Sequence, residues 1–345
     1  MKAPRIKSII SFVFCLALIA PIAIHCFADK TPLNVHLSTI FGFAQFFAFP
    51  ILFGTVGFCC SAGIVILLIF RSKLGGSFSR RVIFPWMLLS IFFAVFIMLG
   101  NNPTRAAVDK SGKSLKLVEW NAAGSPSAEN AKIIFLDFDA DIAVFPELGN
   151  YSLSLKESDW ISDAFSKAGI DIGLYDIFTH LPIAGGIAPV TVIVKKSFAS
   201  YHPTDGTSDM TLFGTVYLSS VTEGIPDIIA LHTSPPLPGM MTFWNSDIDL
   251  AASLSDSHAN ALIAGDFNAT LRHGSLNNIT QHFDALESVS PAKRGTWPAK
   301  FSPSFRSSID HVLLPDSCSV KSAEVKTLNG SDHAAIFLDL IISFD

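Results

Sequence analysis

Charged side chains are scarce in this chain of 345 residues, of which only 15% are Asp, Glu, Lys or Arg. Soluble domains carry about 25%. Half of the residues are hydrophobic, and 30 are phenylalanine. A disordered chain would be rich in charge and poor in large apolar side chains. The composition therefore excludes disorder, and it is not typical of a purely soluble protein.

Acidic residues are almost absent from the first third of the chain. Residues 1–114 contain 11 Lys and Arg but only Asp29 and Asp109, a net charge of +9. Residues 115–345 contain 13 Lys and Arg against 27 Asp and Glu, a net charge of −14, which brings the whole chain to −5. This asymmetry predicts two parts in different surroundings.

Cysteine is also rare, with five residues in the chain. Four of them lie in or beside apolar segments, and Cys318 alone lies in the acidic part. A single thiol cannot form a disulfide within that part, and the chain has no CxxC spacing for a metal. We interpret the cysteines as small packing residues.

Three runs contain no Asp, Glu, Lys or Arg: residues 8–27, 41–70 and 82–99. A membrane span needs about 20 apolar residues. The second run is too long for one untilted helix, and Pro50 divides it. We expect spans at 8–27, 51–70 and 82–99 within an anchor of residues 1–100. Residues 36–49 are then an interfacial or re-entrant segment, or an extension of the second span.

The first run has an alternative interpretation, a cleaved signal peptide, because Lys2, Arg5 and Lys7 precede it. Its apolar core is longer than that of a typical signal, and further runs follow, so an anchor is favoured. Basic residues also set the expected orientation. They occur before the first run and in the second loop (71–81), whereas the first loop holds only Lys30. We expect a cytoplasmic N-terminus and an extracytoplasmic acidic part.

The acidic part alternates between strand-like and helix-like patterns after a linker at 101–114. Strands are predicted at 115–120, 142–145, 191–194, 212–218, 228–231, 261–264, 309–314 and 335–341. Helices are predicted at 125–137, 154–167 and 243–254. Residues 115–345 therefore fit one α/β domain with a large core.

Polar side chains follow the predicted strands at the points where they end: Asn121, Glu147, His232, Asp266, Asn268, Asp310, His311, Asp332 and His333. Strand ends are where a sheet usually presents a site. The set contains carboxylates, amides and imidazoles but no thiolate, and such ligands suit Mg²⁺ or Mn²⁺. The chain lacks a serine elbow and a glycine-rich phosphate loop. These groups predict metal-assisted hydrolysis of phosphodiesters or phosphomonoesters.

Each motif alone also fits a turn, a helix cap or a core histidine. Their order in one domain (N, E, H, GDFN, ID, SDH) resembles the endonuclease/exonuclease/phosphatase superfamily. This superfamily includes DNase I-like nucleases, abasic-site endonucleases, inositol-polyphosphate phosphatases and neutral sphingomyelinases. The resemblance covers residues 115–342, and GDFN and SDH are its specific motifs. The apolar segment before it is similar to the membrane-anchored bacterial branch. The resemblance implies a four-layered α/β sandwich in a bacterial inner membrane protein, with a periplasmic catalytic domain.

The resemblance also implies roles for the site residues. Glu147 is the principal metal ligand, with Asn121 beside it, and Asp332 lies near the metal as a ligand of a second site. Asp266 orients or activates the attacking water. The remaining members act on the phosphate: Asn268 positions it or the water, His232 contacts it or assists the leaving group, and His333, held by Asp310, is a general acid/base or stabilises the transition state.

The chain departs from the family pattern at three places. Pro146 replaces the glutamine that usually precedes the metal-binding glutamate. His311 stands where an aromatic residue is common, and we interpret it as structural. Residues 173–189 are unusual for the family and are expected to form a lid or a wall of the substrate site. No carboxylate could be assigned to orient His232.

The substrate stays open between nucleic acid, a phospholipid headgroup and a small phosphoester. The charge of −14 argues against tight binding of duplex DNA, which relies on Lys and Arg. A membrane tether would raise the effective concentration of the site near lipid. The apolar run at 237–243 fits either a bilayer contact or a loop plug. Two non-enzymatic alternatives are an inactive tethered binding module and a transporter, and no obligate protein partner is inferred.

Overall fold

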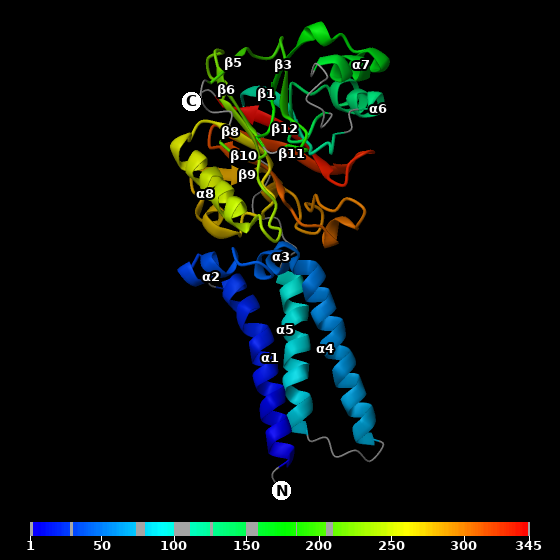
Figure 1. Cartoon of the computed structure of the whole chain (residues 1–345). Helices are drawn as coiled ribbons and strands as arrows, with labels where there is room; N and C mark the ends of the chain where they lie inside the picture. Colours follow the sequence, from blue (N-terminus) through cyan, green and yellow to red (C-terminus); the bar gives the residue numbers. More distant parts are fainter. Residues whose placement is uncertain are drawn as a thin grey trace.

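The computed structural model describes residues 3–27, 30–73, 80–99, 111–124, 127–149, 158–183, 185–204 and 210–343. Three long helices, α1 (Ala3–Phe27), α4 (Pro50–Lys73) and α5 (Arg80–Leu99), lie side by side below a sheet-containing domain (Figure 1). Ser61 of α4 accepts a hydrogen bond from Ser90 of α5. Gly57 leaves room for the ring of Phe93, because a Cβ there would lie 2.4 Å from it. A small residue thus permits close helix packing.

One helical stretch of the described residues, Pro50–Ser72, is long and apolar enough to cross a membrane, with a mean hydropathy of 2.4. The apolar stretches Ser8–Ala20 and Val82–Ala94 are shorter. The structure therefore supports one candidate span by length and composition, and three spans stay a prediction. Most of the predicted linker, residues 101–110, lies outside the described residues.

Residues 30–49, which we call the collar, connect α1 to α4 through two short helices, α2 (Pro32–Leu37) and α3 (Phe43–Ala48). The collar is not an extension of the second apolar helix. Pro50 begins α4, and proline favours the first turn of a helix because it has no N–H to donate. Gly42, with φ of 90°, separates α2 from α3 in a conformation that favours glycine.

The domain contains two six-stranded mixed sheets. The first has the order β11 (Cys318–Thr327), β12 (Ala334–Ile342), β1 (Lys113–Glu119), β2 (Ile142–Phe145), β4 (Val190–Lys195), β3 (Tyr175–His180). The second has the order β5 (Tyr201–Pro203), β6 (Thr215–Ser220), β7 (Ile228–His232), β8 (Leu262–Asp266), β10 (Asp310–Pro315), β9 (His282–Asp284). The pairs β1–β2 and β7–β8 are parallel, and the others are antiparallel.

The main core lies between the two sheets. Alternate residues of the strands face it, such as Leu115 and Leu117 of β1 and Ile228 and Ala230 of β7. Helices cover the outer faces: α6 (Ala128–Ala131), the π-helix at Lys132–Asp137 and α7 (Ser158–Ala168) pack on the first sheet, and α8 (Met241–Ser257) on the second. Figure 1 shows α7 and α8 on opposite sides of the domain. The expected α/β fold with two sheets is therefore confirmed.

Four strands escaped the sequence analysis: β3, β5, β9 and β11. The segment 173–189, which we expected to be a lid or a wall, contains the edge strand β3, which pairs with β4 from Tyr175↔Lys195 to His180↔Val190. β11 has a polar, largely exposed second half and therefore lacks a continuous apolar pattern.

Candidate active site

The polar residues singled out in the sequence gather at one edge of both sheets. Asn121 and Glu147 follow β1 and β2, and His232 and Asp266 end β7 and β8. β10 is antiparallel to β8, so its first residue, Asp310, pairs with Asp266. β12 is antiparallel to β1, and His333 directly precedes it. The carboxyl ends of β1, β2, β7 and β8 thus meet the amino ends of β10 and β12.

Asn121 joins the two carboxylates of the site. Its Nδ2 donates to Glu147 Oε1 at 3.1 Å and to Asp266 Oδ2 at 3.0 Å. Its Oδ1 accepts from the backbone N–H of Ala123 at 3.0 Å, which fixes the orientation of the amide. Burial raises the pKa of Glu147 above its usual value, and only part of this effect is offset by the hydrogen bond from Asn121.

Asp266 is almost fully buried, and its Oδ1 accepts from the backbone N–H of Asn268 at 2.7 Å. Asn268 has φ of 44°, a left-handed conformation that asparagine tolerates better than most residues. Its side chain donates to Thr233 O at 2.8 Å. Burial and the negative charge of Asp310 raise the pKa of Asp266 to about 7.

His333 is paired with Asp310, whose two oxygens lie 3.0 and 2.9 Å from its Nδ1. Its Nε2 is 3.9 Å from Asp266 Oδ2. Burial alone would lower the pKa of His333, but the charge and hydrogen bond of Asp310, with the charges of Asp266 and Asp332, raise it to about 10. The imidazole is therefore a cation at neutral pH.

His232 has the opposite character. It is buried, and its ring contacts that of Phe213, with centroids 5.0 Å apart. Its Nε2 lies 3.6 Å from Glu147 Oε1 and 3.7 Å from Asp266 Oδ2. Burial and the nearby charge of His333 lower the pKa of His232 to about 3. The ring is thus neutral, and two carboxylates face it where the sequence had assigned none.

Asp332 lies at the exposed margin of this group, close enough for its charge to raise the pKa of Glu147 and of His333. Its side chain is exposed, and its Oδ2 accepts from Trp297 Nε1 at 2.8 Å. His311 is structural, as expected: its Nδ1 is 2.7 Å from Asp284 Oδ2, and its Nε2 is 2.9 Å from Ala269 O. Both partners hold His311 inside the second sheet, away from the site edge.

Glu119 and Trp297 are residues near the site that sequence analysis missed. Glu119 is fully buried in β1, and neither of its carboxylate oxygens has a partner among the described residues. Burial raises its pKa well above the usual range, and the charges of Asp310, Asp266 and Asp284 raise it further. Glu119 continues the inward alternation of Leu115 and Leu117, a signal that could have revealed it. The centroid of the Trp297 ring is 6.4 Å from that of His333.

The donor set fits a divalent cation. Ligand atoms of Asp266, Asp310 and His333 lie within 4.8 Å of one another, but the protonated ring of His333 cannot ligate a metal, so the candidate ligands are the carboxylates. Glu147 adds a carboxylate to Asp266, and none of the ion pairs seen among the described residues joins these acids to a lysine or arginine. Buried carboxylates need compensating charge, and Mg²⁺ and Mn²⁺ prefer oxygen ligands of this type.

Comparisons with solved structures find proteins of related architecture. An endonuclease/exonuclease/phosphatase family protein from Bacteroides thetaiotaomicron is 14% identical to this chain. The alignment covers 68% of this chain and 100% of that one, with a TM-score of 0.46. The human Nocturnin catalytic domain with bound sulfate is 15% identical (67% and 94% covered, TM-score 0.45). Truncated Caenorhabditis elegans TDP2 is also 15% identical (68% and 100% covered, TM-score 0.44).

No curated protein sequence matches the chain. The model of the Endonuclease/Exonuclease/phosphatase family matches residues 118–333, well over half of the chain, and it includes every candidate site residue. On that match, this chain belongs to the Endonuclease/Exonuclease/phosphatase family.

Proposed function

We propose that this protein is a membrane-anchored phosphoesterase that depends on a divalent metal and hydrolyses phosphodiester or phosphomonoester bonds. Members of its family are typically hydrolases of phosphoester bonds and generally use a divalent metal. The observation that carries the proposal is the convergence of Asn121, Glu147, Asp266, His232 and the His333–Asp310 pair at one edge of two sheets.

Glu147 would hold the Mg²⁺ or Mn²⁺ ion, with Asn121 beside it, and Asp266 is left free to act on the attacking water. When bound, such an ion neutralises the charge of the phosphoryl oxygens and favours attack by water. Asp332 stays the candidate ligand of a second metal ion. In this structure its carboxylate accepts a hydrogen bond from Trp297.

The remaining groups divide the proton chemistry. Asp266 orients the attacking water and accepts its proton, and a pKa of about 7 suits a base at neutral pH. Asp310 accepts from Nδ1 of His333, so Nε2 of the cationic ring is left to donate to a phosphoryl oxygen as charge develops there. Neutral His232 supplies a hydrogen bond to the substrate or the leaving group, and Asn268 positions the phosphate or the water.

An inactive binding module is the weaker candidate, because every residue of the expected catalytic set is present and most of the set converges. A nuclease acting on DNA or RNA is a second candidate within the same chemistry. The acidic charge of the domain weighs against it, since nucleic-acid binding relies on Lys and Arg contacts with phosphates.

The test is hydrolysis of bis-p-nitrophenyl phosphate by the full chain in nanodiscs with Mn²⁺. Glu147→Gln and His333→Gln should each lower turnover by about 10²- to 10⁴-fold. Glu324→Gln and His202→Gln are matched controls, because both residues are exposed and lie on β11 and β5. A chelator should abolish turnover, and added Mn²⁺ should restore it. Equal turnover of wild type and both site variants would refute the proposal.

A further inference from the structure

We propose that the substrate of this site is a phosphoester carried by a membrane lipid. The reason is that the collar places the site edge next to the ends of the apolar helices that lie nearest the domain. This inference rests on the proposed function above. It adds the substrate class and the surface through which the substrate enters.

The collar is packed into the domain. Ala44 is 1% exposed and belongs to the same apolar cluster as Trp244 and Ile248. Its carbonyl lies 3.0 Å from Nε2 of the buried His273, and Ser38 Oγ accepts from Gly274 N at 2.9 Å. These contacts place the collar against the outer side of the second sheet, beside α8.

The same collar touches the two loops that flank the site. Gln45 donates to the carbonyl of Pro236, four residues after His232. On the other side, the rings of Phe49 and Trp297 have centroids 6.0 Å apart, and Trp297 neighbours His333. Figure 1 shows α3 between the domain and the ends of α4 and α5. The site edge therefore faces the helices.

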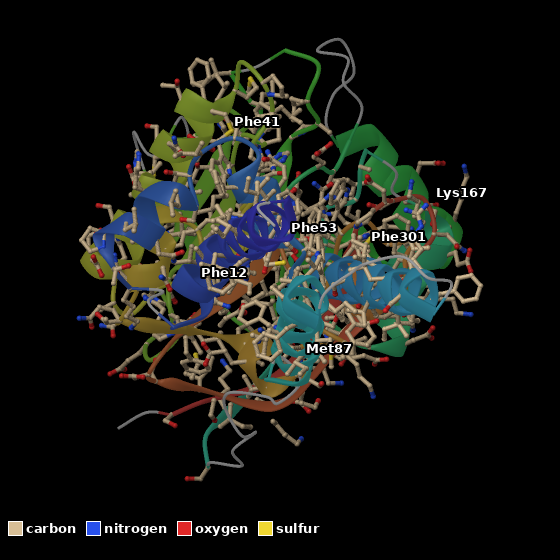
Figure 2. All side chains as sticks on the ribbon, turned by 90° about the horizontal axis from the view of Figure 1, so that it is seen from below. Phe12, Phe41, Phe53, Met87, Lys167 and Phe301 are labelled. Atoms are coloured by element: carbon tan, nitrogen blue, oxygen red, sulfur yellow. The ribbon has the colours of Figure 1, made fainter. Side chains whose placement is uncertain are left out.

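Five exposed apolar side chains lie on the segments that meet at this end of the domain. They come from the collar, from the loop after β7 and the start of α8, and from the loop after Trp297: Leu33 (54% exposed), Phe41 (53%), Leu237 (54%), Phe243 (49%) and Phe301 (44%). Figure 2, which looks toward the domain from the helix side, labels Phe41 and Phe301 at different sides of the helices. We call these five residues the apolar rim.

The apolar rim is suited to contact the surface of a lipid bilayer. α4 begins directly after the collar, and its apolar stretch Pro50–Ser72 is only 11% buried in the protein. When this stretch lies in hydrocarbon, the collar and the rim lie at headgroup depth. Lys300 Nζ lies 5.5 Å from the Phe301 ring, and a basic side chain beside an apolar one favours contact with anionic headgroups. A phosphate at headgroup depth then meets the site edge directly.

The experiment uses the full chain with Mn²⁺, reconstituted into the bilayer of lipid vesicles, and two kinds of substrate. The first is soluble bis-p-nitrophenyl phosphate. The second is the lipid of those vesicles, which is phosphatidylethanolamine, phosphatidylglycerol or sphingomyelin in turn, with headgroup release followed by mass spectrometry. Leu237→Ser and Phe301→Ser alter the rim. Leu174→Ser and Val221→Ser are matched controls, because these residues are 55% and 54% exposed elsewhere.

We expect hydrolysis of at least one vesicle lipid. The ratio of vesicle turnover to soluble turnover should fall at least fivefold in the rim variants and stay within twofold in the controls. Hydrolysis of the soluble ester without release of headgroup from any of the vesicle lipids, or faster hydrolysis of plasmid DNA or RNA by the same vesicles, overturns the lipid inference and leaves the proposed function standing. No turnover of any phosphoester refutes the proposed function as well.

A second readout does not depend on catalysis. Phe301→Cys carrying an environment-sensitive fluorophore, in a chain with Cys59 and Cys60 replaced by alanine, should be quenched by spin-labelled lipid in nanodiscs. Leu174→Cys, labelled in the same way, should not be quenched. Equal quenching of the two positions would show that the rim does not lie at the bilayer surface.

Discussion

At the residue scale, the surroundings of the two site histidines hold them in opposite protonation states. Asp310 and neighbouring charges outweigh burial at His333 and raise its pKa to about 10. At His232, burial and the charge of His333 act in the same direction and lower the pKa to about 3. One ring can therefore donate as a cation, and the other stays a neutral hydrogen-bonding group over the whole physiological range.

Asp310→Asn should lower turnover of bis-p-nitrophenyl phosphate and shift its pH dependence. Because the charge of Asp310 is the main factor that raises the pKa of His333, its loss lets His333 deprotonate at lower pH. We expect the alkaline limb of the rate profile to move down by more than one pH unit, with turnover at pH 7 falling about 10²-fold. A profile with an unshifted alkaline limb would show that His333 does not act as the cation.

Metal affinity should rise with pH, because a cation held by the neighbouring Glu147 and Asn121 is attracted by the ionised form of Asp266 and not by its protonated form. With a pKa of about 7, the carboxyl group is mostly protonated at pH 6 and mostly ionised at pH 8. Calorimetric titration with Mn²⁺ should therefore give an affinity about tenfold weaker at pH 6 than at pH 8. Asp266→Asn should bind Mn²⁺ more weakly at both values and with a smaller difference between them. An affinity of wild type that is independent of pH would contradict this assignment.

At the scale of elements, the site depends on the close approach of β7 and β8. These strands are parallel, and His232 pairs with Asp266 in their register. Gly265 has φ of 145°, and a Cβ at this position would lie 1.9 Å from Leu231 O. Glycine is therefore required here, one residue before the carboxylate that the site needs.

Gly265→Ala should separate β8 from β7 and displace Asp266. We expect a loss of about 3 kcal/mol or more in stability, which corresponds to a fall of about 6 °C or more in Tm, together with loss of turnover. Differential scanning fluorimetry of the full chain measures the first effect. Gly185→Ala is the control, since a Cβ at this position would have no heavy atom of another residue within 4 Å. Similar Tm values for the two variants would refute the steric argument.

At the scale of the whole molecule, the collar connects the apolar helices to the domain. The collar buries Ala44 and Phe47, and it contacts loops on both sides of the site. A fragment that begins at residue 115 lacks this segment, so the full chain is the appropriate material for every assay above.

We propose the topology predicted by the basic loops: three spans in a bacterial inner membrane, a cytoplasmic N-terminus and a periplasmic domain. An alkaline phosphatase reporter fused after Asp345 should be active in cells, and a green fluorescent protein fused there through the same export route should be dark. Fusions at residue 76 should give the reverse, because that loop is expected in the cytoplasm. A bright fluorescent fusion after Asp345 would place the domain in the cytoplasm.

Much of the fold and site could be predicted because the signals are local. The apolar runs, the alternation of β1, the short apolar segments of β2 and β8 and the GDFN and SDH motifs depend on residues that are close in the chain. β3 and β11 were missed because each pairs along one side only, at a sheet edge, and exposes polar residues. Such strands are stabilised by their partners and carry weak patterns of their own.

By itself, the sequence determined that the chain has an apolar basic part and an acidic α/β part, and which residues stand at the strand ends. Only the tertiary structure decided that the collar packs beside the site, that Trp297 and Glu119 lie near it, and that Asp332 turns to Trp297. It also decided the protonation of His232 and His333. Burial and electric field at a group depend on neighbours far away in the chain, such as Asp310 beside His333, and no local pattern encodes them.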